Sequence, residues 1–231
     1  MLTFFGFSSL TSADVEAQIP EIQSETTTAS ASYQNTVVRT GSVVRRNQAQ
    51  SLASSVKVVT PRGHGSGSYI KIERNYYILT AGHVVEGNDI VGIQTSTEFV
   101  FGQVVFVSQT HDIGLVKIPR LANSNEVRHR TSSISDFNIG EEVVYSGYPG
   151  GFEIFTSGAE VAGYSENRRI MVQGFAWPGS SGSGVIDSTG RVRGVVIAIG
   201  IGHGFVPQLL ETMIFIELLS DDVWEQIEDA L

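Results

Sequence analysis

Three short segments of the 231-residue chain carry the side chains that acyl transfer requires. His83 follows an apolar run in the sequence L-T-A-G-H-V-V, where a strand is expected to end in a tight turn. Asp112 directly precedes the apolar run I-G-L-V, and Ser181 lies in the glycine-rich sequence P-G-S-S-G-S-G. Together these residues offer a base, an acid and a nucleophile.

The predicted chemistry follows from these residue types. A serine hydroxyl is a weak nucleophile at neutral pH, so we expect His83 to take the proton of Ser181 and pass it to the leaving amine. The carboxylate of Asp112 would fix the tautomer of the imidazole and stabilise the imidazolium. The expected oxyanion donors are the backbone N–H groups of Gly179 and Ser181, since glycine at position 179 lets the loop turn without a side-chain clash.

The elements that must position these residues read as β-strands. Short runs rich in Val, Ile, Tyr and Phe recur from residue 56 onward, separated by Gly, Pro, Asn and Asp, as is typical of an all-β barrel or sandwich. The runs span residues 56–60, 68–72, 76–79, 90–95, 99–107 and 113–118, and then 142–147, 159–164, 170–174, 184–186, 191–199 and 211–217. Two sets of six predict an all-β protein of two tandem six-stranded antiparallel β-barrels.

The runs also suggest a division of the chain. We expect an N-terminal polar tail over residues 1–50, a first barrel over 51–120, a connector over 121–137, a second barrel over 138–218 and an acidic helix over 219–231. The stretch 24–55 is rich in Ser, Thr, Ala and Gln without sustained periodicity, so it reads as a tail or linker.

Only the C-terminal end is predicted to be helical. Ser220 can cap the helix, and Asp221 and Asp222 favour its positive N-terminus. The apolar residues Val223, Trp224, Ile227 and Leu231 form one stripe along it. We expect this stripe to pack on the domain, because the acidic face would be repelled by anionic lipid.

Composition excludes several classes of site. The chain has no cysteine, so disulfides, thiolate zinc sites and a cysteine nucleophile are ruled out. A net charge of −9 without any Lys/Arg cluster argues against nucleic-acid binding. No apolar run approaches the ~20 residues of a transmembrane helix, and the first residues lack the basic lead of a signal peptide. We expect no metal and no cofactor, and assign no compartment.

The motifs resemble those of a known family. T-A-G-H ending at His83, D-I-G-L-V starting at Asp112 and G-S-S-G-S around Ser181 are similar to motifs of trypsin-like serine proteases of the PA clan. So are G-S-G-S-Y-I at 65–70 and G-E-E-V-V-Y-S-G-Y-P-G at 140–150. Within the clan they most resemble cysteine-poor Deg/HtrA-type bacterial proteases and chymotrypsin-like viral proteases. An α/β-hydrolase would instead run Ser–Asp–His and have Gly where this chain has Ser183.

The resemblance implies a chymotrypsin-like fold and a substrate pocket. Its base would lie near Phe175 and Ala176, and its wall would come from Val196, Ile197, Ala198 and Ile199. Such an apolar, shallow pocket predicts a small or medium hydrophobic P1 residue. Ser180 stands where trypsins have an acid that pairs with a new N-terminus, so activation of that type is not expected.

Two functions compete at this stage. The leading hypothesis is a serine endopeptidase that acts on polypeptides through an acyl-enzyme, for example as a virus- or phage-encoded processing protease. The alternative is a protease-like fold that serves as a structural or binding module, with activity lost or limited to self-cleavage. In either case the N-terminal extension is expected to offer a site for self-association or assembly.

Overall fold

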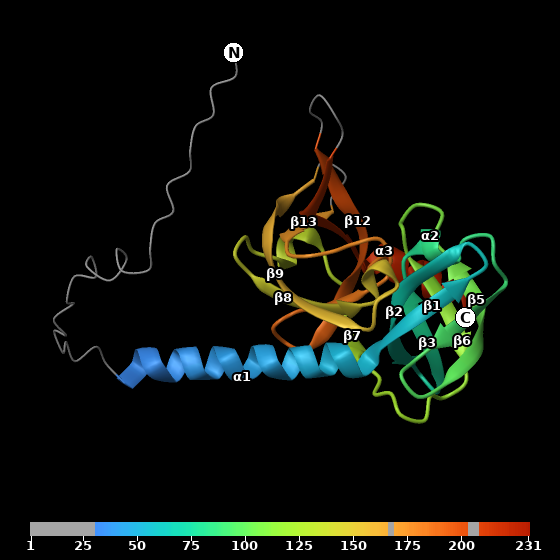
Figure 1. Ribbon diagram of the computed structural model, residues 1–231, viewed down its shortest axis with the longest axis horizontal. Coiled ribbons are helices and arrows are strands. Elements are labelled where there is room, and N and C mark those ends of the chain that lie inside the picture. Colours follow the sequence, from blue (N-terminus) through green and yellow to red (C-terminus); the bar gives the residue numbers. More distant parts are fainter. Residues whose placement is uncertain (1–30, 166–168, 203–207) are drawn as a thin grey trace, which may run out of the picture. The chain divides into compact units, whose positions relative to one another are not determined.

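The computed structural model describes residues 31–165, 169–202 and 208–231, and β-strands make up most of it (Figure 1). The strands form two barrels, which confirms the predicted all-β class and the predicted tandem arrangement. Two helices flank them: α1 (Ala31–Ser54) precedes the first barrel and α3 (Asp221–Ala230) follows the second. None of the helices described here combines the length and apolar character needed to cross a membrane.

The first barrel is closed by six antiparallel strands in the order β1-β2-β3-β6-β5-β4. They are β1 (Ser55–Thr60), β2 (Gly63–Ile72), β3 (Asn75–Thr80), β4 (Ile90–Gln94), β5 (Phe99–Val107) and β6 (Gly114–Ile118). Their interior holds Val56, Val58, Ile78, Ile93 and Val116, all fully or almost fully buried. The short helix α2 (Gly82–Val85) follows β3 and replaces the expected tight turn.

The second barrel also contains six antiparallel strands, closed by the pairing of β11 with β12. They are β8 (Glu142–Gly147), β9 (Phe155–Tyr164), β10 (Ile170–Gln173), β11 (Gly184–Ile186), β12 (Arg191–Gly202) and β13 (Gln208–Leu218). The short strand β7 (Arg128–His129), in the expected connector, adds to β12 in parallel. Single 3-10 turns, η1 (Ile134–Asp136) and η2 (Pro149–Gly151), precede and follow β8.

A shared core holds the barrels together. Leu79 at the end of β3 and Ile113 before β6 pack in one buried cluster with Ile186 and Val195 of the second barrel. Burial of each such side chain contributes about 1.5–3 kcal/mol to folding. Because Leu79 and Ile113 lie within a few residues of His83 and Asp112, this core fixes both segments on the side that faces the second barrel.

Helix α3 joins the same core. Val223 and Ile227 are fully buried in it and Trp224 packs against it, which confirms this part of the expected apolar stripe. Leu231, the last residue of the expected stripe, is half exposed and is not part of the buried core cluster. Ser220 is the N-cap residue, as expected, although its side chain makes no capping hydrogen bond.

Helix α1 corrects the expectation of an irregular tail. Residues 1–30 of the predicted extension lie outside the described residues, but Ala31–Ser54 is helical. Its contact face is polar, since Asn47, Ser51 and Ser54 are buried at helical spacing. The Asn47 amide donates to the carbonyl of Asp187 at 2.8 Å, and that of Gln50 to the carbonyl of Gly190 at 3.0 Å.

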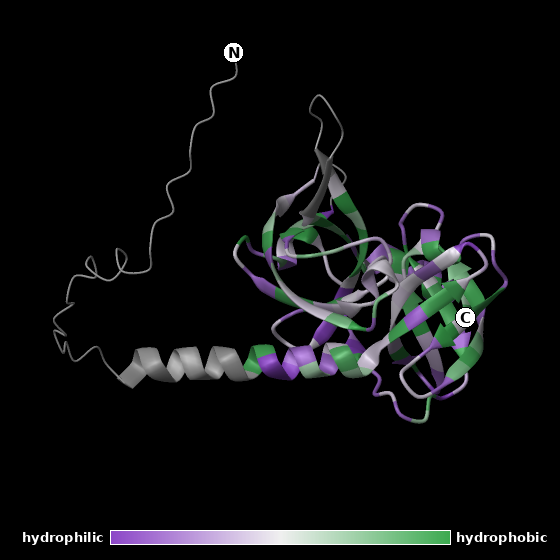
Figure 2. Ribbon diagram, viewed as in Figure 1, coloured by the Kyte–Doolittle hydropathy of each residue, from purple (hydrophilic) through white to green (hydrophobic). Residues whose placement is uncertain are grey.

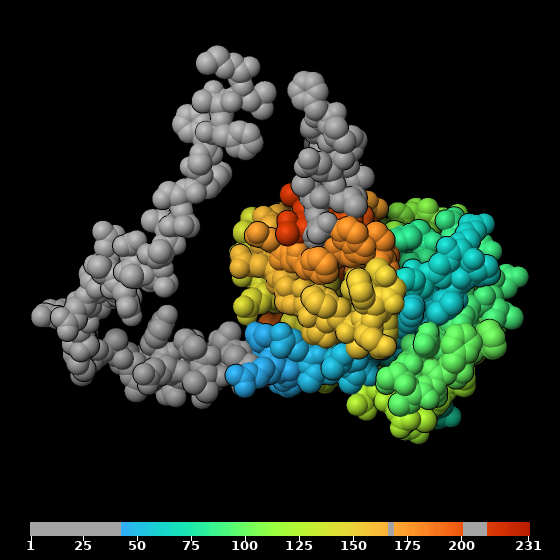
Figure 3. Space-filling view, in the orientation of Figure 1, coloured from blue at the N-terminus to red at the C-terminus, as the bar shows by residue number. Residues whose placement is uncertain are grey.

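A hydrophobic pattern therefore could not reveal this helix, and the coloured part of α1 in Figure 2 alternates between hydrophilic and hydrophobic residues. In the space-filling view the same part of α1 lies along the second barrel (Figure 3). A role of the extension in assembly stays a prediction.

Candidate active site

His83 and Asp112 form a hydrogen-bonded pair at the edge of the first barrel. The ring Nδ1 of His83 lies 2.7 Å from Oδ2 of Asp112, and the backbone N–H of His83 donates to Oδ1 at 2.8 Å. Both carboxylate oxygens are thus engaged by one residue. Gly82 permits this approach, because a Cβ there would lie 3.1 Å from Oδ1 of Asp112.

The surroundings of the pair keep the carboxylate ionised. Burial opposes the charge of Asp112, but the hydrogen bonds from the ring and the amide of His83 outweigh it and hold the pKa of Asp112 below its usual value. The His83 side chain is 46% exposed while that of Asp112 is 23% exposed. The imidazole therefore faces the solvent side, where a substrate can reach it, with an anion behind it.

Ser181 lines the same cavity as His83. A cavity of about 300 Å³ is lined by His83 and Val84 of α2, by His64 of β2, and by Gly179 and Ser181 of the loop between β10 and β11. Among the described residues no hydrogen bond joins the Ser181 hydroxyl to His83. Such contacts are often loose in a protein without substrate and tighten when substrate binds.

The loop around Ser181 leaves two amide donors free. Each of the four carbonyls of residues 178–181 accepts a hydrogen bond. The Pro178 carbonyl accepts from the Gly150 N–H at 2.7 Å, and the Ser180 carbonyl accepts from the Ser183 N–H at 3.1 Å. Ser66 donates twice, with its hydroxyl to the Gly179 carbonyl and with its N–H to the Ser181 carbonyl, both at 2.7 Å. The N–H groups of Gly179 and Ser181 have no acceptor within the described part of the chain, and both residues line the cavity. This is the arrangement expected of an oxyanion hole, with donors preorganised for a developing negative charge.

Glycine is required at position 179 of this loop. Its φ is +102°, and a Cβ there would lie 2.5 Å from the carbonyl oxygen of Tyr148 and 2.6 Å from Nε2 of His64. Ser180, next to it, is buried, and its hydroxyl accepts a hydrogen bond from the Trp177 N–H at 3.2 Å. The loop is therefore ordered by local hydrogen bonds, without an acid at position 180.

The predicted specificity residues do not gather in one cavity. Phe175 lies in an apolar cavity of about 300 Å³ with Phe152, Phe155 and Trp177, which none of residues 196–199 lines. Its carbonyl accepts a 2.5 Å hydrogen bond from Tyr145, whose pKa burial raises to about 12. Ala176, Val196 and Ile197 are buried in core clusters, Ala198 is exposed and Ile199 is half-buried. The P1 pocket stays a prediction.

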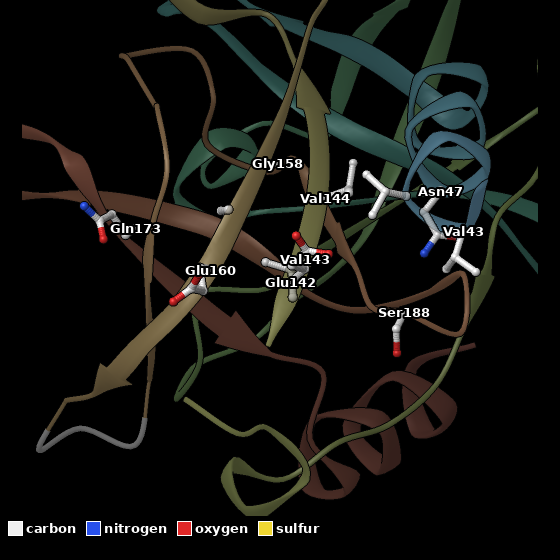
Figure 4. A pocket seen from close by; sticks show the side chains of 11 residues that line it. Val43, Asn47, Glu142, Val143, Val144, Gly158, Glu160, Gln173 and Ser188 are labelled. Carbon is white, nitrogen blue, oxygen red and sulfur yellow. The ribbon is translucent and has the colours of Figure 1, made fainter. Parts of the chain in front are cut away.

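A larger groove lies away from these residues. It has a volume of about 620 Å³ between α1, β8 and β9, and its lining includes Val43, Asn47, Val144 and Gln173 (Figure 4). Its lining contains a serine, Ser188, but no histidine that could act as its base. Among the described residues the groove therefore lacks a serine–histidine combination such as the one that lines the smaller cavity at Ser181.

His111, next to Asp112, points away from the pair toward Asp222 of α3. Its ring lies between Glu217 and Asp222, with an Nδ1–Oε1 distance of 2.9 Å and an Nε2–Oδ2 distance of 2.9 Å. Burial lowers the pKa of His111, but the two carboxylates outweigh burial and raise it overall. Arg169 binds the other oxygen of Glu217 at 2.9 Å. The cluster ties the Asp112 segment to the C-terminal helix.

Sequence reasoning missed the residues that hold the nucleophile loop in place. Ser66 and Gly150 donate hydrogen bonds to carbonyls of this loop, and the Tyr148 N–H donates to the Ser66 hydroxyl, yet all three appeared only as parts of two strand motifs. Because the acceptors in the loop are backbone carbonyls, side-chain chemistry gave no signal of these contacts.

Comparisons with known proteins agree with this geometry. The model of the trypsin-like peptidase domain matches residues 65–195. No curated protein matches the chain. Among solved structures, the active form of the Rv3671c protease from M. tuberculosis is similar with a TM-score of 0.65 and 21% identity over 82% of this chain and 86% of that one.

Two further solved structures share the fold. The HtrA-type protease AlgW, solved with a tripeptide, has a TM-score of 0.62 and 19% identity over 79% of this chain and 62% of that one. The serine protease of a human pathogenic astrovirus has a TM-score of 0.56 and 19% identity over 74% of this chain and 92% of that one. At these identities the similarities establish the fold.

Proposed function

The chain belongs to the trypsin-like peptidase family, and we propose that it cleaves peptide bonds through an acyl-enzyme on Ser181, with His83 and Asp112 completing a catalytic triad. One observation carries the proposal. His83, hydrogen-bonded to Asp112, lines one cavity together with Ser181, and the N–H groups of Gly179 and Ser181 at this cavity have no acceptor among the described residues.

Acylation follows from this geometry. The Oγ of Ser181 attacks the carbonyl carbon of the scissile bond while its proton passes to Nε2 of His83. The Nδ1–H of His83 keeps its hydrogen bond to Asp112, whose ionised carboxylate stabilises the imidazolium. The C–N bond then breaks, and His83 returns the proton to the leaving amine.

Deacylation repeats the sequence with water as nucleophile. His83 takes a proton from the water, the new C–O bond forms, and the ester bond to Ser181 breaks as the hydroxyl regains its proton. In both halves the carbonyl oxygen becomes negative while the N–H groups of Gly179 and Ser181 donate to it. Loss of one such donor costs roughly 10²–10³ in rate in enzymes of this type.

The proposed substrate is a polypeptide with a small or medium apolar P1 residue, and the proposed role is processing, as in a virus- or phage-encoded protease. The P1 preference rests on the apolar residue types at the expected base and wall, among them Phe175 and Ile199, which the structure does not bring into one cavity. The alternative of a binding module without activity is disfavoured by the unshared amide donors, which binding alone does not require.

The test is hydrolysis of a mixed peptide library, read by mass spectrometry, by the wild type, Ser181→Ala and Ser188→Ala. Ser188 is an exposed serine in the turn after β11 and serves as the matched control. We expect cleavage after apolar residues by the wild type and the control, and none by Ser181→Ala. Equal cleavage by all three proteins would rule out Ser181 as the nucleophile, and cleavage after Lys, Arg or Glu would overturn the P1 proposal.

A further inference from the structure

Ser66 of β2 uses every one of its hydrogen-bonding groups to connect the first barrel to the nucleophile loop. It is fully buried. Its hydroxyl donates to the carbonyl of Gly179 at 2.7 Å and accepts from the N–H of Tyr148 at 2.9 Å. Its own N–H donates to the carbonyl of Ser181 at 2.7 Å, and its carbonyl accepts from the hydroxyl of Thr80 at 2.6 Å.

The hydroxyl of Ser66 is the only side-chain donor to a carbonyl between Pro178 and Ser181 in the described residues. The other three carbonyls are held by backbone N–H groups, which no substitution except proline removes. This makes the Gly179 carbonyl the one point of the loop whose orientation depends on a side chain from elsewhere in the sequence.

The direction of the Gly179 carbonyl determines whether its oxygen points into the cavity. A planar trans peptide points its C=O and N–H to opposite sides, so a carbonyl held inward keeps its peptide plane fixed. Gly179 has no Cβ and can rotate more freely than other residues. Without the Ser66 hydroxyl, only the hydrogen bond from the Ser180 N–H to the Trp177 carbonyl at 2.9 Å holds this peptide within the described residues. The Gly179 carbonyl can then turn toward the cavity, where its oxygen repels the oxyanion that the amides should stabilise.

The surroundings leave room for this contact and reinforce it. A Cβ at Gly147 would lie 2.7 Å from the Ser66 hydroxyl, so only glycine permits the serine to sit there. The neighbouring His64 contacts the carbonyl of Tyr148 at 3.0 Å, so β2 holds both backbone polar groups of Tyr148. Gly150, two residues later, then donates to the Pro178 carbonyl at 2.7 Å.

We infer that the Ser66 hydroxyl is a positioning group of the oxyanion hole, which acts by holding the Gly179 carbonyl away from the cavity. This rests on the proposed function of Ser181. The role differs from that of a general structural serine, because its loss should slow the chemical step while substrate binding is kept.

Ser66→Ala tests this, with Ser55→Ala as the matched control. Ser55 is also a buried serine of the first barrel, and its hydroxyl donates to a carbonyl of the second barrel, that of Ser146 at 2.9 Å, outside the nucleophile loop. The readouts are kcat and KM for p-nitrophenyl acetate and the rate of labelling by a fluorophosphonate, whose oxygen enters the oxyanion hole.

We expect Ser66→Ala to lower kcat and the labelling rate about 10- to 100-fold, below the full loss of a donor, with KM within threefold. Ser55→Ala should stay within twofold of the wild type although it also loses a buried hydrogen bond. An unchanged kcat in folded Ser66→Ala, or equal losses in both variants, overturns the inference while the function of Ser181 stands. A wild type without Ser181-dependent labelling overturns the proposed function and the inference with it.

Thermal melts establish whether the variants are folded. If Ser66→Ala does not fold, Ser66→Cys replaces it, since a thiol keeps a weak donor and acceptor. We then expect the labelling rate of Ser66→Cys to fall at least threefold, and an unchanged rate overturns the inference.

Discussion

The two halves of the proposed active site are held in different ways. In the first barrel, His83 and Asp112 are positioned by a hydrogen bond between their side chains and by one from the His83 amide. In the second barrel, the loop around Ser181 is held almost entirely through its backbone carbonyls, and Ser66 is the one side-chain donor to them in the part of the chain that the structure describes. The geometry of the His83–Asp112 half thus depends on the identity of the two side chains. The geometry of the Ser181 half depends on the conformation of the backbone.

This difference predicts which substitutions abolish activity in each half of the site. Isosteric changes that leave the fold intact should destroy function in the acid–base half. In the nucleophile half, changes that alter backbone geometry should matter most, even where no reactive group is removed. The following experiments test this contrast, beginning with the largest effect.

The largest effect among these variants is expected for Asp112→Asn. The amide has nearly the shape of the carboxylate, but it can donate to Nδ1 of His83 and so favour the wrong tautomer of the ring. We expect kcat to fall by roughly 10⁴ with folding retained. Kinetics on p-nitrophenyl acetate measure this, with exposed Asp89→Asn as the control that should stay within twofold. A fall in kcat of less than tenfold would mean that the His83–Asp112 half does not depend on the identity of the side chain at position 112.

The second effect is that of Gly179→Ala, which removes no functional group. The residue has φ of +102°, and the new Cβ would approach the Tyr148 carbonyl within 2.5 Å, so the loop must shift. We expect kcat to fall by about 10²–10³ as the amide donors move. Gly190→Ala, in the β11–β12 turn with φ of +78°, has the same backbone strain far from the cavity.

The pair of variants separates strain from catalysis. Both should lower the melting temperature, because alanine at positive φ is destabilising. Only Gly179→Ala should lose activity. If Gly190→Ala loses as much, the nucleophile loop has no special dependence on its conformation.

The smallest effect concerns His111, which joins the Asp112 segment to α3. Its pKa is raised because Glu217 and Asp222 outweigh burial, with Arg169 bound to Glu217. A raised folded pKa stabilises the protein fully below the unfolded value near 6.5, and this stability is lost as pH rises through the folded pKa. Since the cluster is partly exposed, we expect about 1 kcal/mol.

Melting temperatures of the wild type and His111→Gln from pH 5 to 9 measure this contribution. At low pH the melting temperature of the wild type should exceed that of His111→Gln, and the difference between the two melting temperatures should shrink as pH rises. A difference that grows with pH would contradict the ion-pair account. Activity at constant pH should change less than threefold, because His111 does not touch the His83–Asp112 pair.

The same contrast explains what could be predicted from the sequence. The ranges expected for β5, β8 and β11 agree with the structure, because apolar β-formers between glycine and polar residues mark strands clearly. His83 and Asp112 could be named because their side chains carry the chemistry, and the structure brings them into contact. Ser66 and Gly150, which donate to the nucleophile loop, were missed because their acceptors are backbone carbonyls of a segment distant in the sequence.

Helix α1 was missed for a related reason. Its buried face consists of Asn47, Ser51 and Ser54, so it is stabilised by polar contacts such as that of Asn47 with the Asp187 carbonyl. Apolar periodicity reports only helices that bury an apolar stripe, as α3 does through Val223 and Ile227. Apolar periodicity therefore predicted α3 and did not predict α1.

The most direct test of the account is to identify the residue that reacts with a fluorophosphonate. The wild type, Ser181→Ala and His83→Ala are labelled, digested and mapped by mass spectrometry. We predict one adduct, on Ser181, that is absent from Ser181→Ala and strongly reduced in His83→Ala, since the imidazole must remove the proton. An adduct on Ser180 or Ser183, or labelling that does not depend on His83, would contradict the proposed triad.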